Sequence, residues 1–203
     1  MSKLARVVTV LVVLTAVISV IAVRRSTKTA ADPLIEAACQ GNADRCESLV
    51  KSGIPIDAND WEKNTALTWA VFYCEAGVVK KLLALGADVN HANERRFTPL
   101  MYTATSLRGH ELRGTQAERN EIAALLINHG ADVNQGMGDG HIMGSGETAL
   151  HFAASRKNAD LVRLLLTAGA NKNAKSNDGY TPLDVAQFPD HAPNDEVIHL
   201  LER

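Results

Sequence analysis

The sequence has 203 residues, with 21 basic and 23 acidic side chains, 46% hydrophobic residues and only 4% aromatic residues. This length suits one ordinary domain or a repeat array, and a net charge of −2 argues against a nucleic-acid-binding protein, which must neutralise phosphates. Three cysteines are too few for a small fold held together by disulfides. The scarcity of aromatic residues predicts a core built mainly from Ala, Leu and Val.

The average charge conceals two parts of opposite character. Residues 1–31 contain no acidic side chain and five basic ones, Lys3, Arg6, Arg24, Arg25 and Lys28. Residues 32–203 hold all 23 acidic side chains and therefore have a net charge of −7. Residues 7–23 form an unbroken uncharged apolar run, which as a helix would span about 26 Å. That length is just enough to cross a bilayer if the flanking basic side chains reach its surface.

We expect residues 1–6 to be a short basic N-terminus, 7–23 a single transmembrane or signal segment, and 24–31 a linker. Cleavage of a signal peptide, which would release a secreted or periplasmic body, is the alternative to a retained anchor, although the two arginines after the apolar run disfavour cleavage. Basic residues flank both sides almost equally, so they do not decide the orientation. The short basic start is typical of export signals and favours a body on the non-cytoplasmic, periplasmic side; a cytoplasm-facing body is the alternative.

The body repeats with a period of about 33 residues. One motif recurs as DPLIEAA (32–38), TALTWAV (65–71), TPLMYTA (98–104), TALHFAA (148–154) and TPLDVAQ (181–187). A second motif closes the units as SGIPIDA, LGADVNH, HGADVNQ and AGANKNA, after a Leu-rich run. Thr followed by Pro suits the start of a helix, Gly suits a left-handed helix end, and Asp and Asn suit the turn that follows.

These motifs resemble the ankyrin repeat over about residues 32–203. The resemblance implies an all-α solenoid of about five helix-turn-helix units with projecting hairpin fingers, which bury their apolar faces only by stacking. The expected repeats are 32–59, 60–92, 93–134, 135–173 and 174–203. The interval between the motifs at 98–104 and 148–154 is longer than the others. It places about 11 extra residues in a helix–helix turn within 107–118 and about six in a Gly-rich finger at 134–146.

No cluster of residues in the sequence indicates catalysis, a metal or a cofactor. His110-Glu111 lacks the second His of a zinc-protease motif. We therefore expect no enzyme activity and no cofactor; the alternative is an enzyme that uses the two insertions through His110, Glu111, Asp139 or His141. The cysteines Cys39, Cys46 and Cys74 are expected to lie close together, where they could form one disulfide or remain small buried thiols.

The resemblance implies a monomeric module that binds another protein, not nucleic acid or a small-molecule substrate. Ankyrin arrays bind through finger tips and the concave groove along the first helices, so the candidate contacts by position are Asn59, Trp61, Glu62, Asn64, Phe72, Tyr73, Glu94, Arg95, Phe97, Thr105, Ser106, Arg156, Lys175, Asn177, Asp178 and Tyr180. Trp61 is the most informative, since an exposed aromatic side chain is typical of an interface anchor; it could instead fold back on the neighbouring finger. Trp69 is expected in the core.

The layout also resembles that of bacterial envelope ankyrin-repeat proteins. This resemblance implies a tethered module that assists a neighbouring envelope enzyme, or an immunity protein that neutralises a secreted toxin or effector enzyme. The acidic surplus of the body favours a partner with a basic patch.

Overall fold

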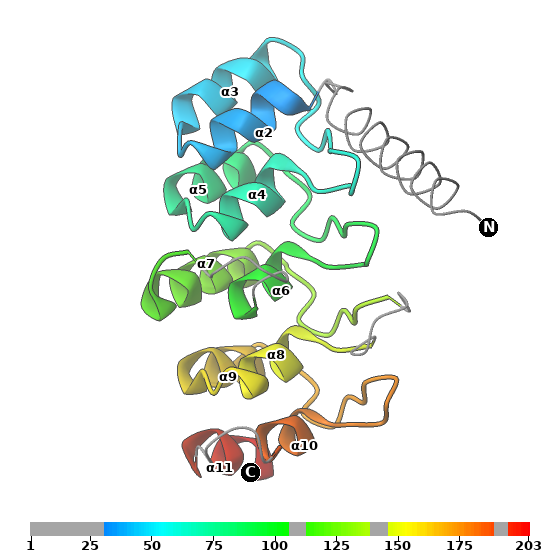
Figure 1. Ribbon diagram of the computed structural model, residues 1–203. Coiled ribbons are helices and arrows are strands. Elements are labelled where there is room, and N and C mark those ends of the chain that lie inside the picture. The colour runs from blue at the N-terminus through cyan, green and yellow to red at the C-terminus, as the bar shows by residue number, and fades with distance from the viewer. Residues whose placement is uncertain (1–30, 106–112, 139–145, 189–194) are drawn as a thin grey trace, which may run out of the picture. The chain divides into compact units, whose positions relative to one another are not determined.

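The computed structural model describes residues 31–105, 113–138, 146–188 and 195–203, in which ten helices pair and stack (Figure 1). The first helices of the pairs are α2 (Asp32–Cys39), α4 (Ala66–Phe72), α6 (Pro99–Ala104), α8 (Ala149–Ser155) and α10 (Pro182–Ala186). The second helices are α3 (Ala43–Lys51), α5 (Ala76–Ala84), α7 (Gln116–Asn128), α9 (Ala159–Thr167) and α11 (Asp195–Glu202).

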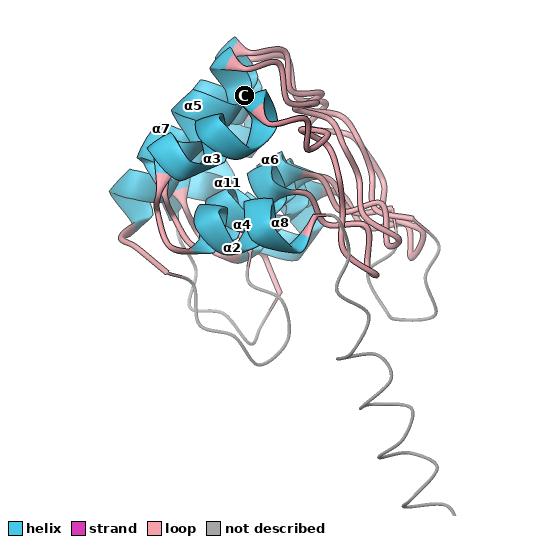
Figure 2. Ribbon diagram, turned by 90° about the horizontal axis from the view of Figure 1, so that it is seen from above, coloured by secondary structure: helices cyan, strands magenta, loops and turns pink. Residues whose placement is uncertain are grey.

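The helices form two layers, with each first helix packed on the next first helix and each second helix on the next second helix. Figure 2 shows the connecting loops projecting on one side of both layers. The predicted stack of helix pairs with projecting fingers is therefore confirmed. None of the described helices is long and apolar enough to span a membrane. The apolar run at 7–23, expected to be an anchor, lies outside the described residues.

The repeated Thr and Gly residues begin and end the helices as expected. The Thr65 side chain accepts a hydrogen bond from the Thr68 N–H, and Thr98 accepts one from the Met101 N–H. These bonds satisfy backbone donors that a helix start leaves open. After four of the second helices the chain passes through a Gly with φ between 87° and 103°, at Gly53, Gly86, Gly130 and Gly169.

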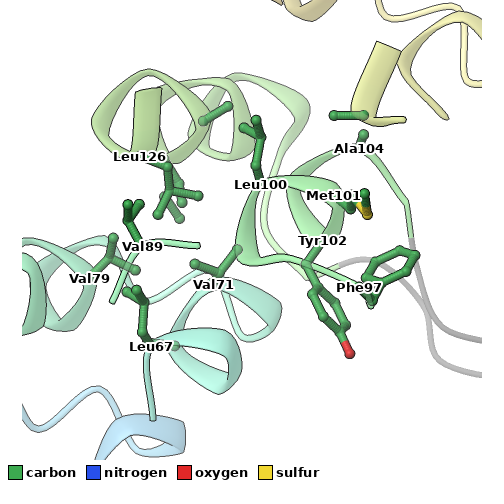
Figure 3. Packing of buried hydrophobic residues seen from close by; sticks show 14 of the residues in the cluster. Leu67, Val71, Val79, Val89, Phe97, Leu100, Met101, Tyr102, Ala104 and Leu126 are labelled. Atoms are coloured by element: carbon green, nitrogen blue, oxygen red, sulfur yellow. The ribbon is translucent and has the colours of Figure 1, made fainter. Parts of the chain in front are cut away.

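The core consists of small and branched aliphatic side chains shared between neighbouring units. Leu67, Leu100 and Leu150, which occupy the same place in three repeats, are at most 1% exposed. Figure 3 shows Leu67, Val79 and Val89 gathered beside Leu126. Burying one such side chain contributes about 1.5–3 kcal/mol, and each unit obtains this only with a neighbour.

A ladder of side-chain hydrogen bonds joins the bases of the fingers. Asp57, Asn90 and Asn134 occupy one position of the repeat, and the Oδ1 atom of each accepts the backbone N–H of the next unit's hairpin, at 3.0, 2.8 and 2.8 Å. The two asparagines also donate Nδ2–H to the carbonyl oxygens of Gly130 and Gly169. Asp57 has no amide with which to make that second bond.

The fingers share one turn. The backbone N–H of Asp60 donates to the Asn64 carbonyl, and Ser176 donates to Tyr180 in the same way. In the fourth unit the corresponding pair is Met137 and Glu147, with N–H to O at 2.9 Å. This pair encloses a longer segment than the others, and residues 139–145 within it lie outside the described part.

The insertion between α6 and α7 differs from the prediction. Gln116–Glu118 were assigned to the insertion, but they form the first turn of α7, which has 13 residues where α3, α5 and α9 have nine. The cause is a capping box: the Thr115 side chain accepts the Glu118 N–H, and the Glu118 carboxylate accepts the Thr115 N–H at 2.7 Å.

The ladder yields the first prediction. Replacing Asn134 with Ala removes two hydrogen bonds to the next unit and should lower the free energy of unfolding by about 1–3 kcal/mol. Asn173→Ala is the matched control, because Asn173 occupies the same repeat position at the last hairpin. Urea unfolding monitored by circular dichroism measures both. Equal losses for the two variants would contradict a role for the ladder.

Candidate protein-binding face

The nine aromatic residues gather on one side of the structure. All belong to the first helices, the residues just after them, or the fingers, and none occurs in α3, α5, α7, α9 or α11. We call this side the inner face, defined by the accessible side chains of the first helices and the fingers. Aromatic side chains are enriched at protein interfaces, so their placement marks the inner face as the candidate binding surface.

Six of these aromatics form one continuous row across the second, third and fourth units. Trp69 contacts Phe72 at 5.6 Å between ring centroids, and Phe72 contacts Tyr102 at 6.1 Å. The row continues from Tyr102 to Phe97 at 4.6 Å and from Phe97 to Phe152 at 5.5 Å, while Tyr73 joins it through Phe72. Most of these contacts are edge-to-face, a favourable geometry for aromatic pairs.

Trp69 differs from its predicted place in the core. It is half-buried, and its indole N–H donates to Asp60 Oδ2 at 2.9 Å. Trp69, Tyr102 and Phe152 share one position of the repeat. That register is the sequence signal that could have placed Trp69 and Phe152 on the inner face, whereas Tyr102 at the same position is only 2% exposed because the Phe72 and Phe97 rings contact it.

Most of the predicted contact residues are accessible. Trp61 is 55% exposed and Tyr180 is 45% exposed, the two large hydrophobic side chains of the described part that are exposed. The other exposed members of the predicted set are Glu94, Arg95, Arg156, Lys175, Asn177 and Asp178. The half-buried members are Asn59, Glu62, Phe72, Tyr73 and Thr105, and Ser106 lies outside the described residues.

Two predicted contact residues are buried inside the protein, so we remove them from the candidate surface. Asn64 is 1% exposed, because its side chain lies between two fingers and accepts hydrogen bonds from Asn93 Nδ2 at 3.1 Å and the Tyr102 hydroxyl at 3.2 Å. Phe97 is 4% exposed because the rings of Tyr102 and Phe152 cover it. Their position in the repeat correctly placed both residues at a finger, but it did not predict that neighbouring side chains bury them.

The end of the long α6–α7 connection packs on the second unit. The Arg113 guanidinium lies 4.7 Å from the centre of the Tyr73 ring, a cation–π distance. Arg119 Nη1 donates to the Arg113 and Gly114 carbonyls, at 3.2 and 2.6 Å. Tyr73 therefore serves an internal contact, which sequence position alone did not reveal.

The three cysteines are free thiols. Cys46 is buried, and Cys39 and Cys74 are half-buried. Burial raises the pKa of all three thiols, that of Cys39 to about 11 with a smaller contribution from Cys46 nearby. Thiolate is the reactive form, so burial makes all three thiols less reactive, and the alternative of one disulfide among them stays a prediction.

A pocket of about 590 Å³ opens on the inner face between the third and fourth units. Its lining combines an aromatic ring, two hydroxyls and three charged side chains, from Thr105, Glu147, Phe152, Ser155, Arg156 and Lys157. The sequence prediction included two of these, Thr105 and Arg156. Burial, with a smaller effect of the neighbouring Asp178 carboxylate, raises the pKa of Glu147 to about 7.

The buried His151 has a structural role. Its Nδ1 accepts the Thr148 N–H at 3.1 Å and its Nε2 donates to the Tyr180 carbonyl at 3.1 Å, which ties the fourth unit to the fifth. Burial lowers the pKa of this imidazole. The residues considered for catalysis, His110, Glu111, Asp139 and His141, lie outside the described residues. Within the described part, no three His, Cys, Asp or Glu side chains are placed to hold a metal ion.

The packing of the α6–α7 connection yields a second prediction. Gly114 has φ +71°, and a Cβ there would lie 2.5 Å from the Cys74 sulfur. Gly114→Ala should therefore cost more than the roughly 1–2 kcal/mol expected for a left-handed Ala. Gly130→Ala is the control, because φ is +87° there and the space beside it is open. Thermal unfolding measures the stability of both variants, and an equal loss of stability would contradict close packing of Gly114 against Cys74.

Comparison with known proteins identifies the repeats. A family model described as ankyrin repeats, three copies, matches residues 11–93, 34–137, 73–176 and 114–201. A fowlpox virus protein named as an ankyrin repeat protein is 35% identical over 62% of this chain and 33% of its own length. The human ankyrin repeat and KH domain-containing protein 1 is 35% identical over 59% of this chain and 4% of its own. The mitochondrial disaggregase of Bos taurus is 32% identical over 76% of this chain and 21% of its own length.

The chain thus spans about a third or less of these relatives. They come from a virus and from animals, so they give no support to the expected bacterial origin. Ankyrin repeats are a general protein–protein interaction module, and proteins built from them are generally non-catalytic. Since the family model covers most of the sequence and the structure shows the stacked helix pairs, the chain belongs to the ankyrin-repeat family.

Proposed function

We propose that this protein is a non-catalytic module that binds a partner protein through its inner face. The observation that carries the proposal is a set of accessible aromatic side chains on the inner face: Trp69, Phe72, Tyr73 and Phe152 of the row are half-buried, and Trp61 and Tyr180 are exposed. Aromatic anchors contribute most of the binding energy in many interfaces. The second helices α3, α5, α7, α9 and α11, which we call the outer layer, contain no aromatic residue.

The fingers support this proposal because they are joined to one another as well as to the helices. The Glu94 N–H donates to the Glu62 carbonyl, and the Gly138 N–H donates to the Arg95 carbonyl, both at 3.0 Å. A surface that is already ordered loses less conformational entropy when a partner binds. The finger side chains therefore present a nearly fixed arrangement.

The binding proposal predicts that Trp61→Ala loses the partner. Proteins retained by the immobilised full chain from cells of its source would be compared with those retained by Trp61→Ala and by Glu121→Ala, a control exposed on α7. We expect the specific partner to be retained by wild type and by the Glu121 variant only. Affinity measured with the purified partner should fall by at least about 30-fold if Trp61 is an aromatic anchor of the interface.

Unchanged affinity of Trp61→Ala would contradict the inner face as the binding surface. The identity of the partner then separates the two narrower roles. A secreted toxin or effector enzyme whose activity falls when the protein binds supports an immunity role. An active envelope enzyme supports assistance to a neighbour.

We further propose that residues 7–23 hold the body at the cell envelope, on the non-cytoplasmic side. The support is that this run is uncharged and apolar throughout and has basic side chains at both ends. A C-terminal alkaline phosphatase fusion should be active and remain with the membrane fraction. Activity in the soluble fraction alone indicates a cleaved signal, and an inactive phosphatase beside a bright cytosol-only reporter contradicts the proposed orientation.

A further inference from the structure

We propose that the pocket between the third and fourth units holds a basic side chain, Lys or Arg, of the partner protein, placed against the Glu147 carboxylate. The inference rests on the proposed function and adds the chemistry of the partner at one defined place. Three observations support this inference: the pocket itself, the burial of the Glu147 carboxylate beside another acid, and the side chains that line the pocket.

Among the residues that the structure describes, none provides a counter-charge for the Glu147 carboxylate. No hydrogen bond or ion pair reaches its side chain from the described residues, and the charged neighbour that acts on it is another acid, Asp178. Both burial and this acid disfavour the ionised form. A cation in the pocket would offset both effects, and a charged side chain of a partner meets this need.

The other lining groups fit the same occupant. Phe152 offers a half-buried aromatic ring, on whose face a guanidinium or ammonium group binds favourably. Thr105 and Ser155 bring hydroxyl oxygens that can accept hydrogen bonds from a guanidinium or ammonium group. An aliphatic stem along the ring and a charged head at the carboxylate describe a lysine or arginine side chain.

The charged residues around Glu147 determine at which part of the pocket the positive charge of the bound side chain lies. Arg156 and Lys157 line the pocket after α8, yet neither lowers the pKa of Glu147. The pocket therefore has a negative part at Glu147, with the Asp178 carboxylate near it, and a positive part at the α8–α9 turn. His151 is neutral when its Nδ1 accepts a hydrogen bond, and Arg95 and Arg96 belong to the neighbouring finger, which touches Gly138. A basic side chain enters at the Glu147 part.

The proposal gives a pH dependence of known sign. The carboxylate has a pKa of about 7, so it is mostly protonated at pH 6 and mostly ionised at pH 8. Lys and Arg stay charged over this range. A peptide whose basic residue binds Glu147 should therefore bind about tenfold more tightly at pH 8 than at pH 6.

The experiment uses short random peptides displayed on phage, selected on the full chain in mild detergent. Binding of selected peptides without His or acidic residues is then measured by fluorescence anisotropy at pH 6 and pH 8. The variants are Glu147→Gln, Glu147→Asp, the outer-layer control Glu121→Gln, and Trp61→Ala. We expect selected peptides to share a Lys or Arg whose replacement by norleucine weakens binding at least about tenfold.

Glu147→Gln should bind the peptides as weakly at pH 8 as the wild type binds the norleucine peptides, and its affinity should not depend on pH. Glu147→Asp should keep the pH dependence of the affinity, and Glu121→Gln should bind as the wild type does. The Gln variant should unfold no earlier than wild type at pH 8, because the buried charge that destabilises the fold there is gone. Peptides that need Trp61 but bind Glu147→Gln equally well would overturn the basic-residue pocket and leave the proposed function standing. Failure to select any Trp61-dependent peptide would overturn both.

Discussion

Each unit of this protein leaves apolar surface that only the next unit can cover, and one side-chain position sets the two in register. Asp57, Asn90 and Asn134 accept the backbone N–H of the following hairpin, while Ala, Leu and Val side chains fill the space between helix pairs. Hydrophobic burial supplies most of the stability, but it has no direction. The directional bonds at the base of the fingers fix where each finger stands, and the inner face depends on that spacing.

The aromatic residues divide the structure into two layers with different tasks. The second helices carry aliphatic side chains towards the core, with Leu82, Leu126 and Leu165 fully buried. The first helices place their aromatics between the core and the surface, where Trp69 and Phe152 are half-buried. The low aromatic content therefore has two origins: stacked units need few large rings, and the few present are concentrated on the face that we propose meets a partner.

The sequence predicted what each unit does by itself and much less of what neighbouring units do together. The helix starts at Thr65 and Thr98 and the stops at Gly86 and Gly130 follow from local chemistry, as does the repeat period. The start of α7 was missed although the Thr115–Glu118 capping box was present in the sequence. Burial of Asn64 and Phe97, and the pocket at Glu147, depend on contacts between consecutive fingers, which no single repeat contains.

The long finger begins and ends, and the α6–α7 insertion ends, at residues that the scaffold holds by its own bonds. Met137 and Glu147 close the long finger with the same backbone pairing as the short ones, and the Thr115–Glu118 capping box starts α7 immediately after the other insertion. The segment between Met137 and Glu147 can therefore change in length and composition without disturbing the helix pairs, whereas the end of the other insertion is constrained because Arg113 and Gly114 pack against Tyr73 and Cys74. A laboratory library, or natural divergence, could exchange the segment of the long finger as a cassette beside an unchanged pocket, so recognition can diversify here faster than the fold.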